Sequence, residues 1–229
     1  MIASPAADHW AATCERLADL GRRLAIDGAA EADLERFEHL VDQVVVWLGW
    51  SVFHADPTRP FFHRHNDLVS QWGGPNADNV YRHARIEPNR RYVVRGRMHG
   101  CDEFLLAVRA GFMHRPVWGT LAQLTASDLG IGPGDEFELH FGGDHPDAVG
   151  LPEGAAMISV REYYVDWRPE EPATFTIECL DPDPPPEGSP DAAGARFGER
   201  LDEALAEITD SITYWDDYMA GNRADRVDN

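Results

Sequence analysis

Residues 79–98 have the sequence NVYRHARIEPNRRYVVRGRM, in which two short segments flank the turn-forming residues EPN. Both segments are rich in β-branched and aromatic residues, and polar and apolar side chains tend to alternate along them. A period of two is typical of β-strands, whereas a helix has a period near 3.6. The stretch therefore predicts two strands, and it marks the point, at about residue 80, where the chain changes from helical to β structure.

Four more segments have the same composition and are separated by turn clusters such as HGCD, GIGPG and LPEG. They cover residues 103–112, 135–143, 156–166 and 173–180. About six strands with no helical crossover between most of them favour an antiparallel sheet over a parallel α/β sheet. We therefore expect a mainly β fold, an antiparallel jelly-roll-like β-sandwich, over residues 80–180.

Helices are expected on both sides of the sandwich. Residues 1–50 predict a helical pair, because apolar residues recur there at steps of three and four. Residues 195–220 predict a C-terminal helix with an apolar seam from Phe197 to Met219. The other ranges are a Pro/Gly-rich connection at 51–79, a Pro-rich linker at 181–194 and a frayed tail at 221–229. The sequence thus predicts one β domain with helical flanks.

The charge of the chain limits its partners. Its 229 residues carry 40 acidic and 20 basic side chains, a formal net charge of −20, so nucleic acids and anionic membranes would both repel it. Because the sequence has no apolar run of membrane-spanning length and no signal-peptide pattern, we expect a cytoplasmic protein. The three cysteines form no CxxC pair, and no Walker loop or dinucleotide fingerprint is present, so we expect no cofactor.

Arginines are concentrated in the first two predicted strands, and they allow two interpretations. In RRYVVRGRM, Arg91, Arg95 and Arg97 share one face, while EFELHF places Glu136 and Glu138 on one face. If these strands are neighbours, the arginines can pair with the glutamates across the sheet. Alternatively, the arginines line a concavity for a carboxylate or phosphate, because the guanidinium fork matches such anions.

The segment VREYYVDW places polar side chains on both faces of a strand. Arg161 and Tyr163 share one face, and Glu162 and Tyr164 share the other. A strand with two polar faces needs hydrogen-bond partners on both. Either one face lines a pocket, or loops that cover the strand bond to these side chains.

The segment FFHRHND suggests a metal site. In an extended conformation it places His63, His65 and Asp67 on one side, and two histidines with one carboxylate are a set that divalent metals accept. The other interpretation is that these histidines cap or pair with their acidic surroundings in a loop. We expect no resident metal, and a metal-dependent jelly-roll enzyme that uses His63 and His65 is an alternative.

The segment QWGGPNADN precedes the first strand and combines turn residues with hydrogen-bonding side chains. It can form a corner in which asparagine side chains bond to the backbone, or it can form part of a ligand site at the mouth of the sandwich. In the second case we expect Arg91 or Arg161 to hold an anionic group. The candidate ligand-binding residues are Trp72, Asn76, Asp78, Asn79, Tyr81, Arg91, Arg161 and Tyr163.

Several of these segments together resemble one protein family. WGGPNADNVYRHARIEPNRRYVVRGR, the strands that follow and VREYYVDWRPEEPATFTIE are similar to the bacterial domain-of-unknown-function family numbered 1214, over about residues 70–180. The resemblance implies a β-sandwich of jelly-roll type, in agreement with the strand pattern, and it implies no reaction and no catalytic residue. Many members also carry an N-terminal partner domain of the family numbered 1254, where this chain has two predicted helices.

These observations leave three functions open. The first is a bacterial small-molecule-binding protein or a metal-independent auxiliary enzyme, of lyase, isomerase or hydrolase type, acting on an anionic or polar metabolite. The second is a non-catalytic structural or interaction module that forms a homo-oligomer through its amphipathic helices. The third is the metal-dependent enzyme. No nucleic-acid or membrane partner is expected for any of them.

Overall fold

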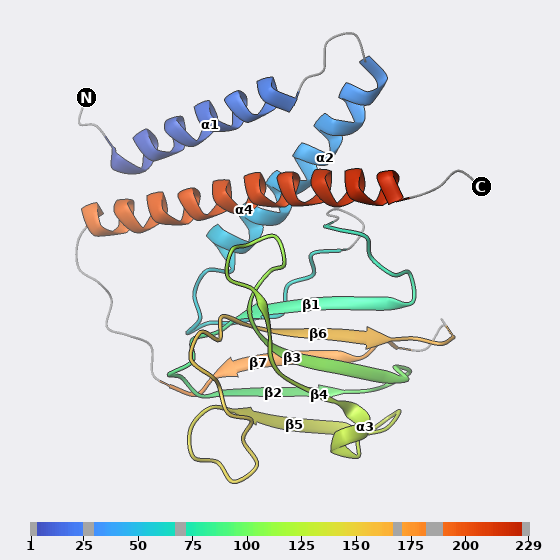
Figure 1. The fold of residues 1–229 in the computed structure, drawn as a ribbon. Helices are drawn as coiled ribbons and strands as arrows, with labels where there is room; N and C mark the ends of the chain where they lie inside the picture. The colour runs from blue at the N-terminus through green and yellow to red at the C-terminus, as the bar shows by residue number, and fades with distance from the viewer. Residues whose placement is uncertain (1–3, 25–29, 67–71, 167–170, 182–189, 226–229) are drawn as a thin grey trace. The chain divides into compact units, whose positions relative to one another are not determined.

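The alternating segments form two antiparallel sheets, and the helices form a unit of their own. The computed structural model describes residues 4–24, 30–66, 72–166, 171–181 and 190–225. Figure 1 shows the elements of both units. The helical unit comprises Met1–Phe53, Val69–Gly73 and Pro186–Asn229, and the β unit comprises His54–Leu68 and Gly74–Pro185. The sequence predicted helices that flank a single β domain, whereas in the structure the long helices make up a second unit.

The helical unit contains three long helices. They are α1 (Pro5–Leu24), α2 (Ala30–Leu48) and α4 (Pro190–Asp225), and α2 continues into a π-helical turn, η1 (Gly49–Phe53). The middle of the predicted seam of α4 is buried, as expected, at Leu201, Leu205, Ile208 and Ile212. No described helix is long and apolar enough to cross a membrane.

Helix α4 is longer than the sequence predicted. It begins at Pro190, inside the range expected to be a linker, and it ends at Asp225, inside the range expected to be a frayed tail. Proline is well suited to the first turn of a helix, because the N–H that it lacks would have no intrahelical partner there. The two alanines that follow, Ala192 and Ala193, are strong helix formers. Met219, at the end of the predicted seam, is half-exposed.

The described residues of the β unit form seven strands in two sheets. The strands are β1 (Asn79–Arg85), β2 (Tyr92–Arg97), β3 (Glu103–Gly111), β4 (Gly119–Thr125), β5 (Glu136–Phe141), β6 (Met157–Tyr163) and β7 (Thr174–Cys179). One sheet has the order β1-β6-β3-β4 and the other has the order β5-β2-β7, with antiparallel pairs throughout. The expected antiparallel β-sandwich is confirmed.

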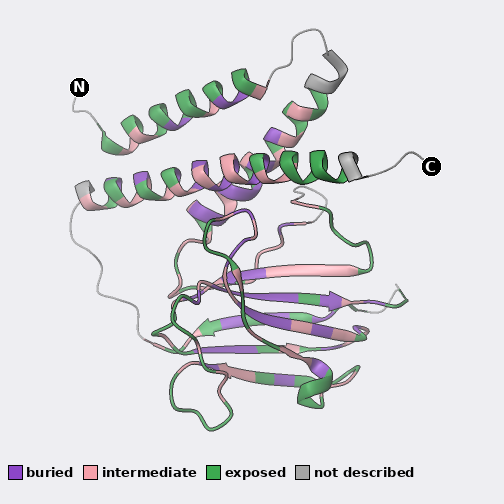
Figure 2. Ribbon diagram, in the orientation of Figure 1, coloured by how far each residue is buried: buried purple, intermediate pink, exposed green. Residues whose placement is uncertain are grey.

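Side chains from both sheets meet in one core. Phe104 on β3, Phe137 on β5 and Phe175 on β7 contact one another, with ring centroids 5.2 to 5.4 Å apart. Figure 2 shows the buried residues concentrated in strands such as β3 and β6. Ile158 and Val160 of β6 belong to this core, so the residues between and after them lie on the opposite face of the sheet.

Strand β4 was not expected from the sequence. Its residues, GTLAQLT, include only two large apolar side chains, Leu121 and Leu124, and they show little alternation. The strand lies at the edge of its sheet and pairs with β3 through a register that shifts twice. Edge strands need less apolar surface than central strands, which explains the weak pattern. Thr125 at its end caps the short helix α3 (Ala126–Leu129).

Candidate anion-binding site

The face of the four-stranded sheet opposite the core, called here the outer face, is polar. Strand β6 alternates, so Ile158 and Val160 enter the core while Ser159 and Arg161 lie on the outer face. The strand register forms three rows across this face: Tyr81–Arg161–Leu105, His83–Ser159–Ala107 and Arg85–Met157–Arg109. Two residues with short side chains, Ser159 and Ala107, therefore lie in the row between the arginines of β3 and β6.

Arg109 and Arg161 lie on either side of this short pair. Arg161 pairs with Leu105 and Met157 pairs with Arg109, so the two arginines stand four residues apart on neighbouring strands. That separation is about 13 Å along the strand, a gap that two arginine side chains can largely close. Burial lowers the pKa of Arg109, and the charge of Arg161 lowers it further. The two guanidinium groups therefore act on each other.

His83 lies in the middle row and is buried, with 5% of its surface exposed. Burial, followed by the charge of Arg109, lowers its pKa to about 3, so its imidazole is neutral at pH 7. The backbone of His63 pairs with that of His83, and each N–H donates to the other carbonyl at 2.8 Å. Residues directly opposite in such a pair point to the same face, so His63 also lies on the outer face.

Four histidine rings lie in contact on this face and are called here the histidine row. Ring centroids are separated by 4.3 Å between His54 and His63, 4.8 Å between His63 and His65, and 4.7 Å between His65 and His83. Phe112 packs 5.0 Å from the ring of His65. Burial lowers the pKa of His54 to about 4 and that of His65 well below its usual value. The permanent positive charge of this face therefore comes from arginines.

Arg109 and Arg161 have no carboxylate partner among the described residues, unlike Arg82 in the core. The Nε atom of Arg109 and the Nδ1 atom of His83 are buried, and neither has a hydrogen-bond partner in the described parts of the chain. The guanidinium of Arg161 instead lies over the ring of Tyr81, with Cζ 5.0 Å from the ring centroid. Since buried polar atoms normally have partners, these two nitrogen atoms on one face mark a place where an anion can bind.

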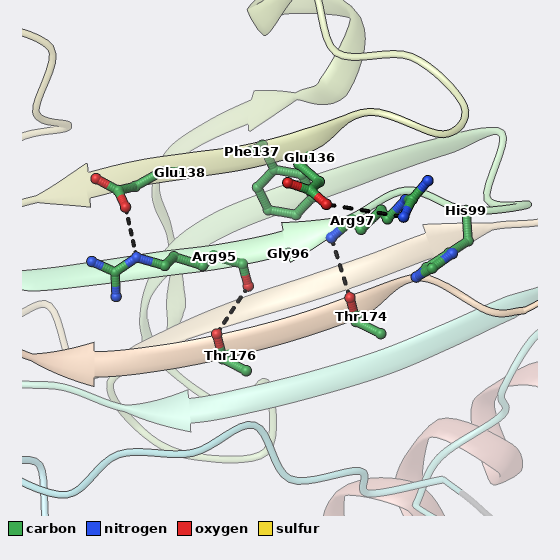
Figure 3. A pocket seen from close by; sticks show the side chains of 9 residues that line it. All are labelled: Arg95, Gly96, Arg97, His99, Glu136, Phe137, Glu138, Thr174 and Thr176. Carbon is green, nitrogen blue, oxygen red and sulfur yellow. Dashed lines mark hydrogen bonds and ion pairs between the residues drawn. The ribbon is translucent and has the colours of Figure 1, made fainter.

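The arginines of the three-stranded sheet, by contrast, are paired. Arg95 on β2 donates to Glu138 on β5 at 2.6 Å and to Glu178 on β7 at 2.9 Å, and Arg97 lies 3.9 Å from Glu136. All of these except Glu178 border an open hollow of about 670 Å³, and Figure 3 shows the Arg95–Glu138 pair among the residues that line it. The expected pairing of arginines with glutamates across the sheet is confirmed. The hollow therefore offers an anion little uncompensated charge.

The core-facing polar side chains of VREYYVDW are satisfied inside the β unit. The Nε–H of Arg82 donates to Glu162 at 2.5 Å, and the Tyr164 hydroxyl donates to the same carboxylate at 2.6 Å. The Tyr164 hydroxyl also accepts a hydrogen bond from the N–H of Ala173 at 2.9 Å. For this face, the interpretation that a covering segment supplies the partners is confirmed. Arg161, on the opposite face, has the different surroundings described above.

The segment before β1 is a turn closed by its own side chains. The Asn76 side-chain oxygen accepts from the N–H of Asp78 at 2.9 Å, and the N–H of Asn79 donates to the Asn76 carbonyl at 3.1 Å. The Tyr81 hydroxyl accepts from the N–H of Asn76 at 3.3 Å. The corner interpretation therefore holds for Asn76, Asp78 and Tyr81. Asn79 begins β1 opposite Tyr163, which is half-buried.

Two of the expected ligand-binding residues have other partners. Trp72 belongs to the helical unit, where its indole N–H donates to the Ser211 hydroxyl at 3.1 Å. Arg91 forms an ion pair with Asp181 at 2.7 Å. Of the expected set, Arg161 lies in the candidate site with Tyr81 against it. Sequence reasoning missed His83 and Arg109, although alternation along YRHAR and LLAVRAG places both opposite the core.

A complete metal site is not found in the described residues. His63 and His65 do share one face of the extended segment, as the alternation predicts. Asp67, the third expected ligand, lies outside the described residues. In the parts of the chain that the structure describes, no three histidine, cysteine or acidic side chains are placed to hold one ion. The metal-dependent alternative stays a prediction.

Comparison with known proteins supports the fold. No family model and no curated protein matches the chain. A crystal structure of an uncharacterised protein from Burkholderia cenocepacia is similar, with a TM-score of 0.81 and 22% sequence identity. The match covers 95% of this chain but 61% of that protein, so this chain spans less than two thirds of its length. At this identity the likeness shows a shared fold and leaves the function to be argued from the site.

Proposed function

We propose that this protein binds a small anionic molecule on the outer face of the four-stranded sheet, through Arg109 and Arg161. The observation that supports this function is that both arginines lie on one face beside His83, with no carboxylate partner among the described residues, in a chain with a net charge of −20. A half-buried guanidinium such as that of Arg109, acted on by a second positive charge, is unfavourable unless an anion compensates it. A purely structural role would be better served by the ion pairs that Arg95 and Arg97 make on the other sheet.

His83 supplies a neutral hydrogen-bonding group beside these charges. One tautomer of its imidazole can donate from Nδ1 to a bound anion, and the other can accept a proton there. An anion bound nearby would raise the pKa of His83 from its low value, because it favours the charged form. In the catalytic form of the proposal, His83 transfers a proton in a metal-independent lyase, isomerase or hydrolase reaction.

A thermal-shift screen of anionic metabolites tests the binding function. A ligand present at one hundred times its dissociation constant stabilises the protein by about 2.7 kcal/mol. We expect a hit to stabilise the wild-type chain and the matched control Arg95→Gln, and to lose its effect in Arg109→Gln and Arg161→Gln. If no anion stabilises the protein, or if both site variants respond like the control, the proposed function is wrong.

A second function, a homo-oligomeric module, is supported by an exposed apolar stripe on α2. Leu34, Phe37, Val41 and Val45 follow one another at steps of three and four residues, and each is 38% to 60% exposed. We propose a second copy of the chain as the partner of this α2 stripe. A stripe along one helix can pack on its own copy about a two-fold axis. Apolar contact also allows two chains of charge −20 to meet without opposing their acidic residues.

We also propose that the chain belongs to the family numbered 1214 and acts in the cytoplasm. The two segments that carry the resemblance, NVYRHAR and MISVREY, form the neighbouring strands β1 and β6. If this chain and the family share one sheet, the resemblance should fall on strands that pair with each other, as these two do. The three cysteines are free, which is the usual state of thiols in a reducing compartment.

A further inference from the structure

We propose that the group held by Arg109 and Arg161 is a phosphoryl group in its dianionic form, carried by a phosphate monoester or present as inorganic phosphate. The inference rests on the proposed function, because it names the chemistry of the same anion site. It follows from the charge of the outer face, from the number and direction of its hydrogen-bond donors, and from one hydroxyl group in the row between the arginines.

The charge of the site matches a dianion. Arg109 and Arg161 supply two positive charges, and Arg85 lies in the same row as Arg109. His65 and His83, held in their neutral forms by burial, add none at pH 7. Arg109 is half-buried and Arg161 is exposed, and a monoanion would compensate only one of their two charges. A phosphate monoester carries nearly two negative charges at pH 7, since its second pKa is about 6. Carboxylates and sulfate monoesters carry only one.

The donors come from three directions. His83 lies on β1 in the middle row of the outer face, while Arg161 on β6 and Arg109 on β3 lie in the rows on either side of it. A carboxylate has two oxygens in one plane, and a single guanidinium fork is enough to bind both. A phosphoryl group has three terminal oxygens arranged around phosphorus, each a strong acceptor. Two guanidinium forks and an imidazole N–H therefore match a phosphoryl group better than a carboxylate.

The middle row also contains a hydroxyl group with a weak partner. The Ser159 hydroxyl is buried and lies 3.4 Å from the Ala107 carbonyl. That distance is long for a hydrogen bond between two oxygens, which is usually 2.5 to 3.0 Å. The hydroxyl can rotate to donate to a phosphoryl oxygen instead, at little cost. Ser159 thus adds a fourth donor, in the middle row between the two arginines.

Isothermal titration calorimetry with four probes at pH 8 tests the inference. The probes are phenyl phosphate, inorganic phosphate, phenyl sulfate and benzoate. Phenyl sulfate has nearly the shape of phenyl phosphate but one negative charge fewer, so it isolates the effect of charge. We expect at least one of the two phosphates to bind ten times more tightly than phenyl sulfate and benzoate. The tighter of the two phosphates identifies the source of the phosphoryl group.

The outcomes separate the inference from the proposed function. If phenyl sulfate or benzoate binds as tightly as the phosphates, the phosphoryl inference is wrong while the anion-binding function stands. If none of the four probes binds, and no other anion does, the proposed function is wrong as well. Arg109→Gln and Arg161→Gln should each weaken phosphate binding at least tenfold, whereas the control Arg95→Gln should not. Phosphate binding that both site variants retain would place the site elsewhere.

A second measurement needs no variant and therefore does not depend on the folding of one. Between pH 8 and pH 5 a phosphate monoester dianion gains one proton and becomes a monoanion, while a sulfate monoester keeps its charge. The titratable and charged groups near the site are His54, His63, His65, His83, His114, Arg85, Arg109 and Arg161. A change in the charge of any of these groups affects the binding of phenyl phosphate and the binding of phenyl sulfate alike. We expect the ratio of phosphate to sulfate affinity to fall towards one, and a constant ratio would contradict the inference.

Discussion

The guanidinium group of Arg161 lies over the ring of Tyr81, with Cζ 5.0 Å from the ring centroid. The hydroxyl of the same tyrosine accepts a hydrogen bond from the N–H of Asn76, in the turn before β1. The turn therefore holds the ring, and the ring positions the arginine. Although Asn76 and Asp78 build a corner, that corner supports the candidate anion site through Tyr81.

Replacing the Tyr81 ring should weaken anion binding without removing a ligand. A cation–π contact at a partly exposed site is worth about 0.5 to 1 kcal/mol. Tyr81→Leu should therefore weaken phosphate binding roughly twofold to fivefold in calorimetry. Tyr81→Phe keeps the ring and should change the affinity less than twofold. If the two variants lose the same affinity, the hydrogen bond to Asn76, and not the ring, positions Arg161.

The stability of the fold should fall on mild acidification. Burial holds the pKa of His54 at about 4 and that of His83 at about 3, whereas a histidine in the unfolded chain titrates near 6.5. Between these values the unfolded chain binds more protons, so stability that is fully present above pH 6.5 is lost as the pH falls. Each such histidine contributes at most about 1.4 kcal/mol per pH unit. Urea unfolding between pH 7.5 and pH 5 measures the slope.

The change of the free energy of unfolding with pH should depend on buried histidines and not on exposed ones. In His83→Asn the loss of stability between pH 7.5 and pH 5 should be smaller than in the wild-type chain. His145→Asn replaces an exposed histidine and serves as the matched control, with the slope of the wild-type chain. Equal slopes in all three proteins would show that His83 is not held neutral by the fold.

Removing the charge of Glu162 should destabilise the β unit strongly. Its carboxylate is fully buried and bonds to both Arg82 and Tyr164. Glu162→Gln leaves the Arg82 guanidinium in the core without a counter-charge, a change that costs about 3 kcal/mol or more. Glu138→Gln breaks an exposed pair with Arg95 and should leave the urea midpoint nearly unchanged. If the urea midpoint shifts by a similarly small amount in both variants, the carboxylate of Glu162 does not stabilise the core as described.

The purified protein should contain metal well below one equivalent per chain. The histidine row lies beside the positive charge of Arg109, which lowers the pKa of His83 and would also oppose a divalent cation. Elemental analysis of the wild-type chain and of the double variant His63→Ala/His65→Ala gives the comparison. One equivalent in the wild-type chain that disappears in the double variant would establish the metal-dependent alternative instead.

The α2 stripe should set the oligomeric state. If a second copy packs on it, light scattering after size exclusion should give a dimer mass for the wild-type chain. Val41→Glu introduces a charge into the centre of the stripe and should give the monomer mass, because burying an unpaired carboxylate is costly. Glu38→Gln changes a charge on the same helix and serves as the control. A wild-type chain that is a monomer at every concentration contradicts the oligomeric module.

The sequence predicted the structure well wherever a local period decides it. The change to a period of two at about residue 80 predicted the sandwich, and the alternation along FFHRH placed His63 and His65 on one face. The pairing of Arg95 with Glu138 was also predictable, since each residue stands in a row of alternating charged positions on its own strand. In each case a repeat of a few residues carries the information.

The candidate site was harder to predict because it depends on strand order. His83 and Arg109 meet only because β6 lies between β1 and β3, and each of those pairings joins residues far apart in the chain. Trp72 was misassigned for the same reason, since its hydrogen bond to Ser211 joins residues 139 positions apart. Arg161 was found as a candidate, but its partner Arg109 has no local pattern that distinguishes it from any other strand arginine.

The helical unit is assembled from three separate parts of the chain, Met1–Phe53, Val69–Gly73 and Pro186–Asn229, with the sandwich encoded between them. During synthesis, α2 can pack against α4 only after the whole of the β unit has left the ribosome, because domains fold as their residues emerge. Neither unit is one continuous segment of the sequence. Deletion of α4 would remove the Ser211 hydroxyl that donates to Gln43, and so would damage a region translated more than a hundred residues earlier.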